Sequence, residues 1–223
     1  RVFFAIPWGD RTVLGTTDTD ERGDLARPRV TLADVQYLLE AANHGFPSVR
    51  LGVDDVLGAW AGLRPLIRPE EEQSASDVPR EHRVIADGRV VSVAGGKLTT
   101  YRRMAAETVD AALVAAGIKA GESRSEEVPL PGAEGPRLDF ERRAEEVMAS
   151  HRLDRDIAER LVNVYGHRAS GVLERVARRP SLAARLDPGS PVIEAEVVFA
   201  AEAELALDVD DVLVRRTSLA LRL

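Results

Sequence analysis

The chain contains, at residues 94–102, the stretch Ala94-Gly95-Gly96-Lys97-Leu98-Thr99-Thr100-Tyr101-Arg102. It follows an apolar run, residues 90–93, that is typical of a strand, and it opens a segment of helical periodicity that ends at Gly117. Two adjacent glycines let the backbone approach a ligand closely, and the N–H groups at the start of a helix favour an anion. The stretch therefore indicates either an ordinary strand-to-helix turn or a turn that holds a phosphate or an electron-rich ring.

The composition excludes several classes of protein. The 223 residues carry a net charge of −7, which argues against a nucleic-acid-binding protein that works through a basic surface. The absence of cysteine excludes a disulfide framework and thiolate metal ligands, and four scattered histidines predict no metal site. The sequence has no apolar run of about 18 residues and no signal peptide, so we expect a cytoplasmic protein.

The first 120 residues mix the signals of strands and helices. Gly9-Asp10 and Asp87-Gly88 each separate two apolar runs and predict β-hairpins. Thr31 is a suitable N-cap for the helix that the periodicity after it predicts. Residues 56–66 are predicted to form another strand, and the polar, acidic residues 68–80 an exposed loop.

The rest of the chain has a different character. Residues 121–136 are rich in glycine and proline, which is typical of a linker. Only helical periodicity follows, and helices are predicted at residues 138–150, 154–165, 170–178, 192–203 and 209–221. The sequence thus predicts an α+β region at residues 1–120, a linker at 121–136 and a small helical domain at 137–223.

Three cations stand where a ligand could bind. Arg64 follows an apolar run, Arg80 lies where the acidic stretch meets a predicted strand, and Lys97 lies in the glycine turn. Together they would form a phosphate clamp, because the planar fork of arginine matches phosphate oxygens in pairs. A solvated surface charge is the simpler interpretation of Arg64 and of Arg80, since sequence spacing does not show that the three cations converge. Asp18 and Asp20 are interpreted as turn formers rather than as metal ligands or acid–base groups.

Five groups of residues, in this order and spacing, resemble the FAD-dependent, aerobic glycerol-3-phosphate dehydrogenases of bacteria and mitochondria. They are Phe4-Ala5-Ile6-Pro7-Trp8, Gly15-Thr16-Thr17-Asp18-Thr19, Gly62-Leu63-Arg64-Pro65-Leu66, Gly95-Gly96-Lys97-Leu98-Thr99-Thr100-Tyr101-Arg102, and Tyr165-Gly166 with Arg215-Arg216-Thr217. The resemblance covers essentially the whole chain. It implies the C-terminal portion of a D-amino-acid-oxidase-like, glutathione-reductase-like flavoprotein: part of the substrate-binding sheet, followed by a small all-helical C-terminal domain.

The resemblance implies a reaction and the residues that serve it. The reaction would be the oxidation of sn-glycerol 3-phosphate to dihydroxyacetone phosphate, by hydride transfer to FAD. Arg64 and Arg80 would bind the substrate phosphate. Two residues are candidates for the base that removes the hydroxyl proton. Lys97 could act if burial lowers its pKa, and His82 could act if it faces the cleft.

The resemblance also places the cofactor. Gly96, Lys97, Leu98 and Thr99 would lie along the flavin of FAD. Such proteins hold the ADP half of FAD with an N-terminal Gly-x-Gly-x-x-Gly turn, and that fingerprint does not occur in this chain. We therefore expect a fragment of the enzyme that is inactive and binds FAD poorly on its own.

The partners are expected from the same resemblance. Electrons would leave to a membrane quinone or to oxygen. Peripheral association with the inner face of the plasma membrane and a homodimer are both compatible with this interpretation.

Two alternatives to this interpretation remain. One is a related FAD-dependent oxidase that acts on another hydroxy acid or an amine. The other is that the helical domain serves as an interaction module of a larger flavoprotein.

Overall fold

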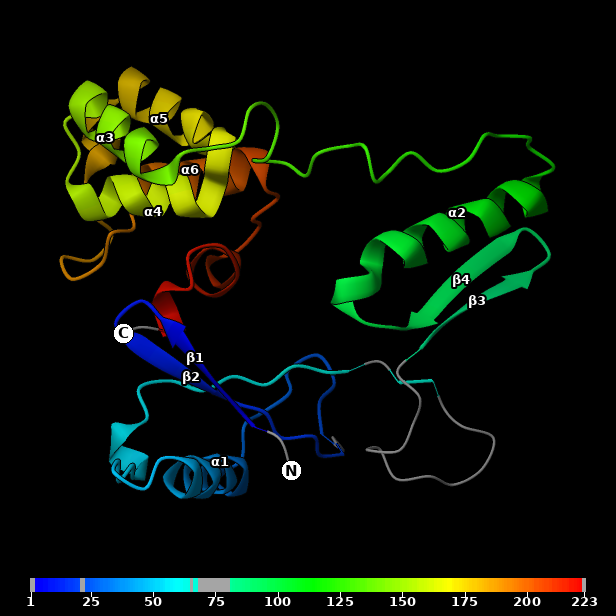
Figure 1. Cartoon of the computed structure of the whole chain (residues 1–223), viewed down its shortest axis with the longest axis horizontal. Helices are drawn as coiled ribbons and strands as arrows, with labels where there is room; N and C mark the ends of the chain where they lie inside the picture. The colour runs from blue at the N-terminus through cyan, green and yellow to red at the C-terminus, as the bar shows by residue number, and fades with distance from the viewer. Residues whose placement is uncertain (1–2, 21–22, 65, 68–80, 222–223) are drawn as a thin grey trace. The chain divides into compact units, whose positions relative to one another are not determined.

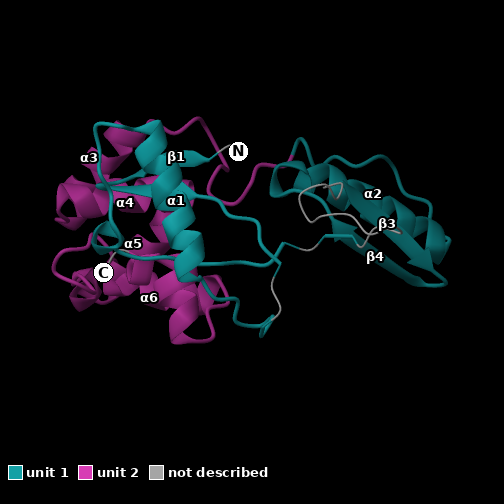
Figure 2. Ribbon diagram, turned by 90° about the horizontal axis from the view of Figure 1, so that it is seen from below, with its two compact units in different colours: residues 1–127 teal, residues 128–223 magenta. Residues whose placement is uncertain are grey.

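The chain forms two compact units, residues 1–127 and residues 128–223, which Figure 2 draws in different colours. The structure is a computed structural model that describes residues 3–20, 23–64, 66–67 and 81–221. The division between the units falls within residues 121–136. The domain ranges 1–120 and 137–223 stay a prediction.

The first unit begins with a β-hairpin and a helix. Strand β1 (Phe4–Trp8) pairs antiparallel with β2 (Arg11–Gly15), and the turn between them places Gly9 at a φ of +63°. Helix α1 (Leu32–Gly45) begins where the sequence predicted it. The Thr31 hydroxyl accepts from the amide of Asp34, and the Asp34 carboxylate accepts from the amide of Thr31, each at 3.2 Å. This capping box satisfies two N–H groups that the first turn of a helix leaves unpaired.

The strand predicted for residues 56–66 is wrong across the part of it that the structure describes. Residues 56–64 lie in no helix or strand, and Leu57, Trp60 and Leu63 stay about half exposed. A strand needs a neighbour for its backbone hydrogen bonds, and no strand pairs with this segment within the described part of the chain. The ring of Trp60 meets that of Trp8 edge to face, with 5.6 Å between the ring centroids.

A second hairpin and a helix complete the described part of the first unit. Strand β3 (His82–Asp87) pairs antiparallel with β4 (Val90–Gly95), so the predicted hairpin is confirmed. A single 3-10 turn, Leu98–Thr100, then leads into helix α2 (Tyr101–Ala116), which packs on both strands (Figure 1). The helix ends at Gly117, whose φ of +68° is the left-handed conformation that glycine adopts most readily.

The second unit is a bundle of four helices with short 3-10 turns between them (Figure 1). The helices are α3 (Phe140–His151), α4 (Arg155–Tyr165), α5 (Ala169–Arg178) and α6 (Glu194–Ala203). Their inward faces bury a continuous apolar core that includes Leu161, Val162, Val172, Ile193 and Phe199. The four helices predicted up to residue 203 are thus confirmed.

The fifth predicted helix, residues 209–221, is confirmed in its first part and is wrong as one continuous element. Residues 209–210 are helical and lead into a π-helix at Asp211–Arg216, and a separate 3-10 turn follows at Leu219–Leu221. The Val212 carbonyl accepts from both the amide (2.9 Å) and the hydroxyl (2.7 Å) of Thr217. Because this side chain competes for a helical carbonyl, and Ser218 has a φ of +55°, the helix cannot continue. Among the described residues, no helix is both long and apolar enough to cross a membrane.

Candidate active site

The two glycines of residues 95–97 are required by the packing of the turn itself. Gly95 and Gly96 have φ values of +73° and +87°, where other residues are strained. A Cβ on Gly95 would lie 2.7 Å from the carbonyl oxygen of Glu81. A Cβ on Gly96 would lie 2.5 Å from Sδ of Met104 and 3.1 Å from Cβ of His82. The turn is therefore pressed against the start of β3 on one side and against α2 on the other.

The residues after the glycines form the exposed side of the same turn. Lys97 is extended and exposed, and its carbonyl accepts from the amide and the hydroxyl of Thr100, both at 3.0 Å. Leu98 is 88% exposed, and with Thr99 it opens the helical segment. The first N–H groups of a helix have no partner inside it, and they carry the positive end of its dipole. This side of the turn can thus offer backbone donors and one ammonium group to an electron-rich ligand.

His82, the first residue of β3, lies directly beside this turn. It pairs in register with Gly95, and its side chain is only 15% exposed. Its Nε2 lies 2.7 Å from Oε2 of Glu107 on α2, whose Oε1 accepts from Nε of Arg103 at 2.6 Å. Hydrogen bonds from Arg103 and then from His82 lower the pKa of Glu107. The Glu107 carboxylate is therefore ionised near neutral pH, and Nδ1 is the one ring nitrogen of His82 left for other chemistry.

Arg64 has a carboxylate partner that its position in the sequence did not indicate. Its Nη1 donates to Oδ2 of Asp18 at 2.6 Å, and the two side chains are 39% and 33% exposed. Asp18, interpreted from the sequence as a turn former, is thus an ion-pair partner 46 residues away along the chain. Asp18 and Arg64 belong to two of the motifs that carry the resemblance, Gly15–Thr19 and Gly62–Leu66. Their presence in these two motifs is the sequence signal that could have indicated the ion pair.

The structure places the expected site residues in two separate groups, and one expected residue lies outside the described ranges. The structure brings His82 together with the glycine turn, and it brings Arg64 together with Asp18. No hydrogen bond or ion pair joins Arg64, Lys97 and His82 to one another in the described ranges. Arg80 lies outside the described residues. In the same part of the chain, no group of three or more histidine, aspartate or glutamate side chains could hold a metal ion.

Comparison with known families identifies both parts of the chain. Residues 1–102 match the family described as FAD dependent oxidoreductase, and residues 123–222 match the C-terminal domain of alpha-glycerophosphate oxidase. These matches confirm the expected fold class, a mixed flavoprotein region followed by a helical domain.

Individual relatives agree with these family matches. Glycerol-3-phosphate dehydrogenase 2 of Mycobacterium tuberculosis (strain H37Rv) is 39% identical over 216 residues, which are 96% of this chain and 36% of the relative. Glycerol-3-phosphate dehydrogenase of Synechocystis is 35% identical over 226 residues, 99% of this chain and 40% of the relative.

A solved structure shows the same fold. It is the X-ray structure of the glycerol-3-phosphate dehydrogenase from Bacillus halodurans complexed with FAD, at 32% identity and a TM-score of 0.71. The match covers 96% of this chain and 42% of that one. The chain thus spans about two fifths of the length of the relatives it matches. The resemblance in the motifs is confirmed: the chain matches the two families in succession and is similar to glycerol-3-phosphate dehydrogenases over nearly all of its own length.

Proposed function

We propose that the full-length protein oxidises sn-glycerol 3-phosphate to dihydroxyacetone phosphate with FAD as the hydride acceptor. The observation that carries this proposal is the exposed, donor-rich turn that leads from β4 into α2. It combines two glycines at positive φ with an exposed lysine and the free start of a helix. It also lies within residues 1–102, the part that matches the FAD dependent oxidoreductase family.

The residues of this turn fit the flavin of FAD. We assign Gly96, Lys97, Leu98 and Thr99 to the cofactor, because the glycines leave no side chain on the turn and the exposed amides that follow can donate to ring carbonyl groups. Bound FAD would supply the acceptor for the hydride that leaves C2 of the substrate. The contribution of the protein would be to position the ring and to provide positive charge near it.

We assign Arg64 and Arg80 to the substrate phosphate. The ion pair with Asp18 uses Nη1 of Arg64, so within the described part of the chain Nη2 and Nε are available for phosphate oxygens. Asp18 would fix the direction of the guanidinium plane, which lowers the entropy lost when a phosphate binds. Binding energy from a phosphate remote from the reacting carbon can be used to orient C2.

We propose Lys97 and His82 as the two candidates for the group that takes the proton of the C2 hydroxyl. Lys97 is exposed on the outer side of the turn. His82 could act only through Nδ1, because Nε2 is bound to Glu107. On the basis of the resemblance, we also propose a quinone as the electron acceptor, a cytoplasmic protein that associates peripherally with a membrane, and a homodimer.

The proposed activity is tested by dye-linked oxidation of sn-glycerol 3-phosphate by the full-length, FAD-loaded protein. Glycerol is the control, since it has the same reacting carbon without the phosphate. Turnover that depends on the phosphate supports the proposal. A flavin-loaded protein without such turnover contradicts it and points to another hydroxy acid or an amine as substrate.

The assignment of Arg64 has its own test. Arg64→Ala should lower kcat/KM by about 30- to 5,000-fold, the equivalent of roughly 2–5 kcal/mol for the loss of one partner of a charged pair. Arg11→Ala is the matched control, because Arg11 also forms an ion pair with an aspartate (Asp10, 3.3 Å) in the same unit. Equal kinetics for the two variants would remove Arg64 from the site.

A further inference from the structure

We propose that Glu107 of α2 is a positioning residue, which acts through His82 to hold the Gly95–Lys97 turn in the shape that receives the flavin. The inference rests on the proposed function, because it concerns the same turn. It assigns a role to a helix residue that lies outside the glycine turn and contacts His82.

The Glu107–His82 contact joins the helix to the strand that carries the turn. His82 is the first residue of β3 and the register partner of Gly95, the last residue of β4. Glu107 lies in the second turn of α2, 25 residues away along the chain, and its Oε2 is 2.7 Å from Nε2 of His82. This hydrogen bond thus connects the start of β3 to helix α2, and the Gly95–Lys97 turn lies along the chain between the two hairpin strands and this helix.

Met104 provides a second contact from the same face of the helix. Residues 104 and 107 are three apart, so their side chains lie on one side of α2. The thioether of Met104 fills the space that a Cβ on Gly96 would need. The turn is therefore held by apolar packing at Gly96 and by the hydrogen bond at His82.

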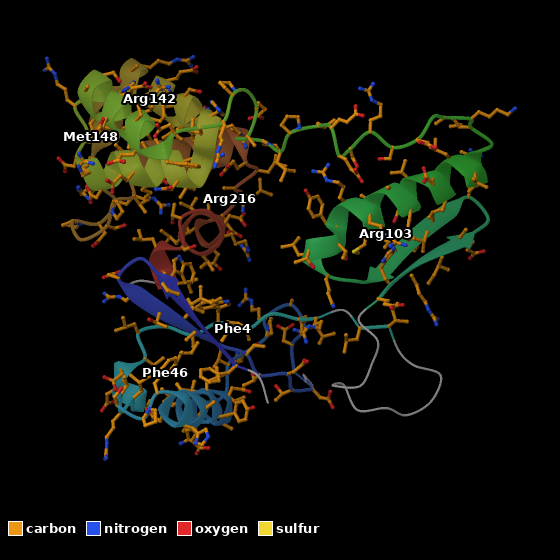
Figure 3. The ribbon with its side chains drawn as sticks, in the orientation of Figure 1. Phe4, Phe46, Arg103, Arg142, Met148 and Arg216 are labelled. Carbon is orange, nitrogen blue, oxygen red and sulfur yellow. The ribbon has the colours of Figure 1, made fainter. Side chains whose placement is uncertain are left out.

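The charge of Glu107 defines which atoms of His82 donate and accept. The carboxylate has one donor on each oxygen, Arg103 on Oε1 and His82 on Oε2 (Figure 3 labels Arg103 on α2). Because an ionised carboxylate can only accept, Nε2 of His82 must donate to it. The neutral ring then carries its lone pair on Nδ1. Glu107 therefore sets both the orientation and the tautomer of His82, as a carboxylate does for the histidine of a catalytic triad.

The experiment compares Glu107→Ala, Glu107→Gln and Asp110→Asn in the full-length protein. Glu107→Ala should raise the dissociation constant of FAD about tenfold, as expected for the loss of a charge-assisted hydrogen bond. Turnover per bound flavin should fall about tenfold while KM changes less than twofold, because the phosphate site is untouched. Glu107→Gln keeps an acceptor oxygen and should stay within about threefold of the unchanged protein.

The controls separate positioning from a general loss of stability. Asp110→Asn removes a carboxylate from the exposed side of the same helix and should change neither value. If Glu107→Ala does not fold, the pair His82→Gln and His82→Asn replaces it. The glutamine amide can reach the position of Nε2 and donate to Glu107, whereas the shorter asparagine cannot. FAD binding should then be retained in His82→Gln and weakened in His82→Asn.

The outcomes distinguish this inference from the proposed function. An unchanged dissociation constant and unchanged turnover per flavin in Glu107→Ala, or equal FAD binding by the two His82 variants, would overturn the positioning role. If the unchanged protein binds FAD without oxidising sn-glycerol 3-phosphate, the proposed function fails. Weaker FAD binding by Glu107→Ala would still support the positioning role in that case.

Discussion

The two units differ in where their apolar side chains lie. In residues 128–223, four helices enclose a core in which Ala158, Leu161, Val162 and others are fully buried. In the described part of residues 1–127, the buried apolar side chains are those of Leu39 and Ala42. The second unit thus has a hydrophobic core of its own, and the first has almost none within the described residues.

All of the described candidate site residues belong to the unit with the small core. Ile85 and Val90 of the second hairpin are 52% and 65% exposed. A two-stranded sheet with one helix on it buries little apolar surface, and isolated two-stranded hairpins are marginal in water. From this contrast we expect the helical unit to be stable by itself and residues 1–127, which carry the candidate site, to be much less stable on their own.

The largest expected effect comes from separating the units. Residues 128–223 expressed alone should unfold cooperatively in denaturant, because their core is complete. Residues 1–127 alone should show no cooperative transition and should bind added FAD poorly. Circular dichroism during urea unfolding, with gel filtration after incubation with FAD, measures both. A cooperative transition and stoichiometric flavin in residues 1–127 would contradict the contrast.

Within the helical unit, the buried carboxylate of Glu196 should have the next largest effect. It is 0% exposed and accepts from Arg160 (3.1 Å), from the Tyr165 hydroxyl (2.9 Å) and from the amide of Ile193 (3.1 Å). Burial, together with this carboxylate, raises the pKa of Tyr165 and keeps it a donor. Glu196→Ala leaves a buried guanidinium unpaired and should lower the free energy of unfolding by about 3–5 kcal/mol.

The control for Glu196 lies on the same helix. Glu202 pairs with Arg175 at 2.6 Å but is 60% exposed, so Glu202→Ala should cost about 1 kcal/mol or less. Both variants are compared by the urea midpoint of the helical unit. A similar loss of unfolding free energy in the two variants would show that burial does not make the Glu196–Arg160 pair more stabilising than an exposed pair.

A backbone change should have a smaller but clear effect. Gly166 has a φ of +56° and a ψ of −131°, and a Cβ there would collide with the carbonyl of Gly132. That same carbonyl accepts from the amide of His167 at 2.9 Å, so it cannot easily move away. Gly166→Ala should therefore cost about 2–3 kcal/mol of unfolding free energy. Gly121→Ala, where nothing lies within 4 Å, is the control and should cost nothing measurable.

The elements that could be predicted from the sequence are those set by local chemistry. The turns Gly9-Asp10 and Asp87-Gly88 and the cap at Thr31 act within a few residues, and each produced the expected element. The described residues of the range 56–66 do not form the predicted strand, because a strand depends on a neighbouring strand that a local sequence pattern cannot supply. The helix predicted to continue to residue 221 ends earlier, because the hydroxyl of Thr217 donates to the Val212 carbonyl.

The candidate site divides in the same way. The Gly95–Thr99 turn was evident from glycine spacing and from the strand and helix on either side. The partners Asp18 of Arg64 and Glu107 of His82 were missed, because they lie 46 and 25 residues away from them along the chain. Charge pairs of this kind are a property of the folded chain, since nothing in their spacing distinguishes them from solvated charges.

The smallest expected effect is an acid-dependent one in the helical unit. Nη1 and Nη2 of Arg185 each donate to one oxygen of Asp156 at 2.8 Å, and these hydrogen bonds hold the pKa of Asp156 below its ordinary 3.8. A carboxyl whose pKa is lowered on folding stabilises the folded state above its unfolded pKa and loses that contribution as the pH falls. Asp156→Asn should therefore cost about 1 kcal/mol or less at pH 7, since the aspartate is 54% exposed.

The pH dependence of Asp156→Asn distinguishes stabilisation by the charge of Asp156 from stabilisation by its hydrogen-bond geometry. Between pH 7 and pH 2 the carboxylate of Asp156 takes up protons as the pH falls toward its lowered pKa, so the advantage of the unchanged protein over Asp156→Asn should decrease in urea unfolding. Glu145, which is exposed on α3, provides the control, and Glu145→Gln should leave the curve unchanged at both pH values. A cost for Asp156→Asn that is equal at pH 7 and pH 2 would mean that the helical unit uses this residue for its hydrogen-bond geometry alone.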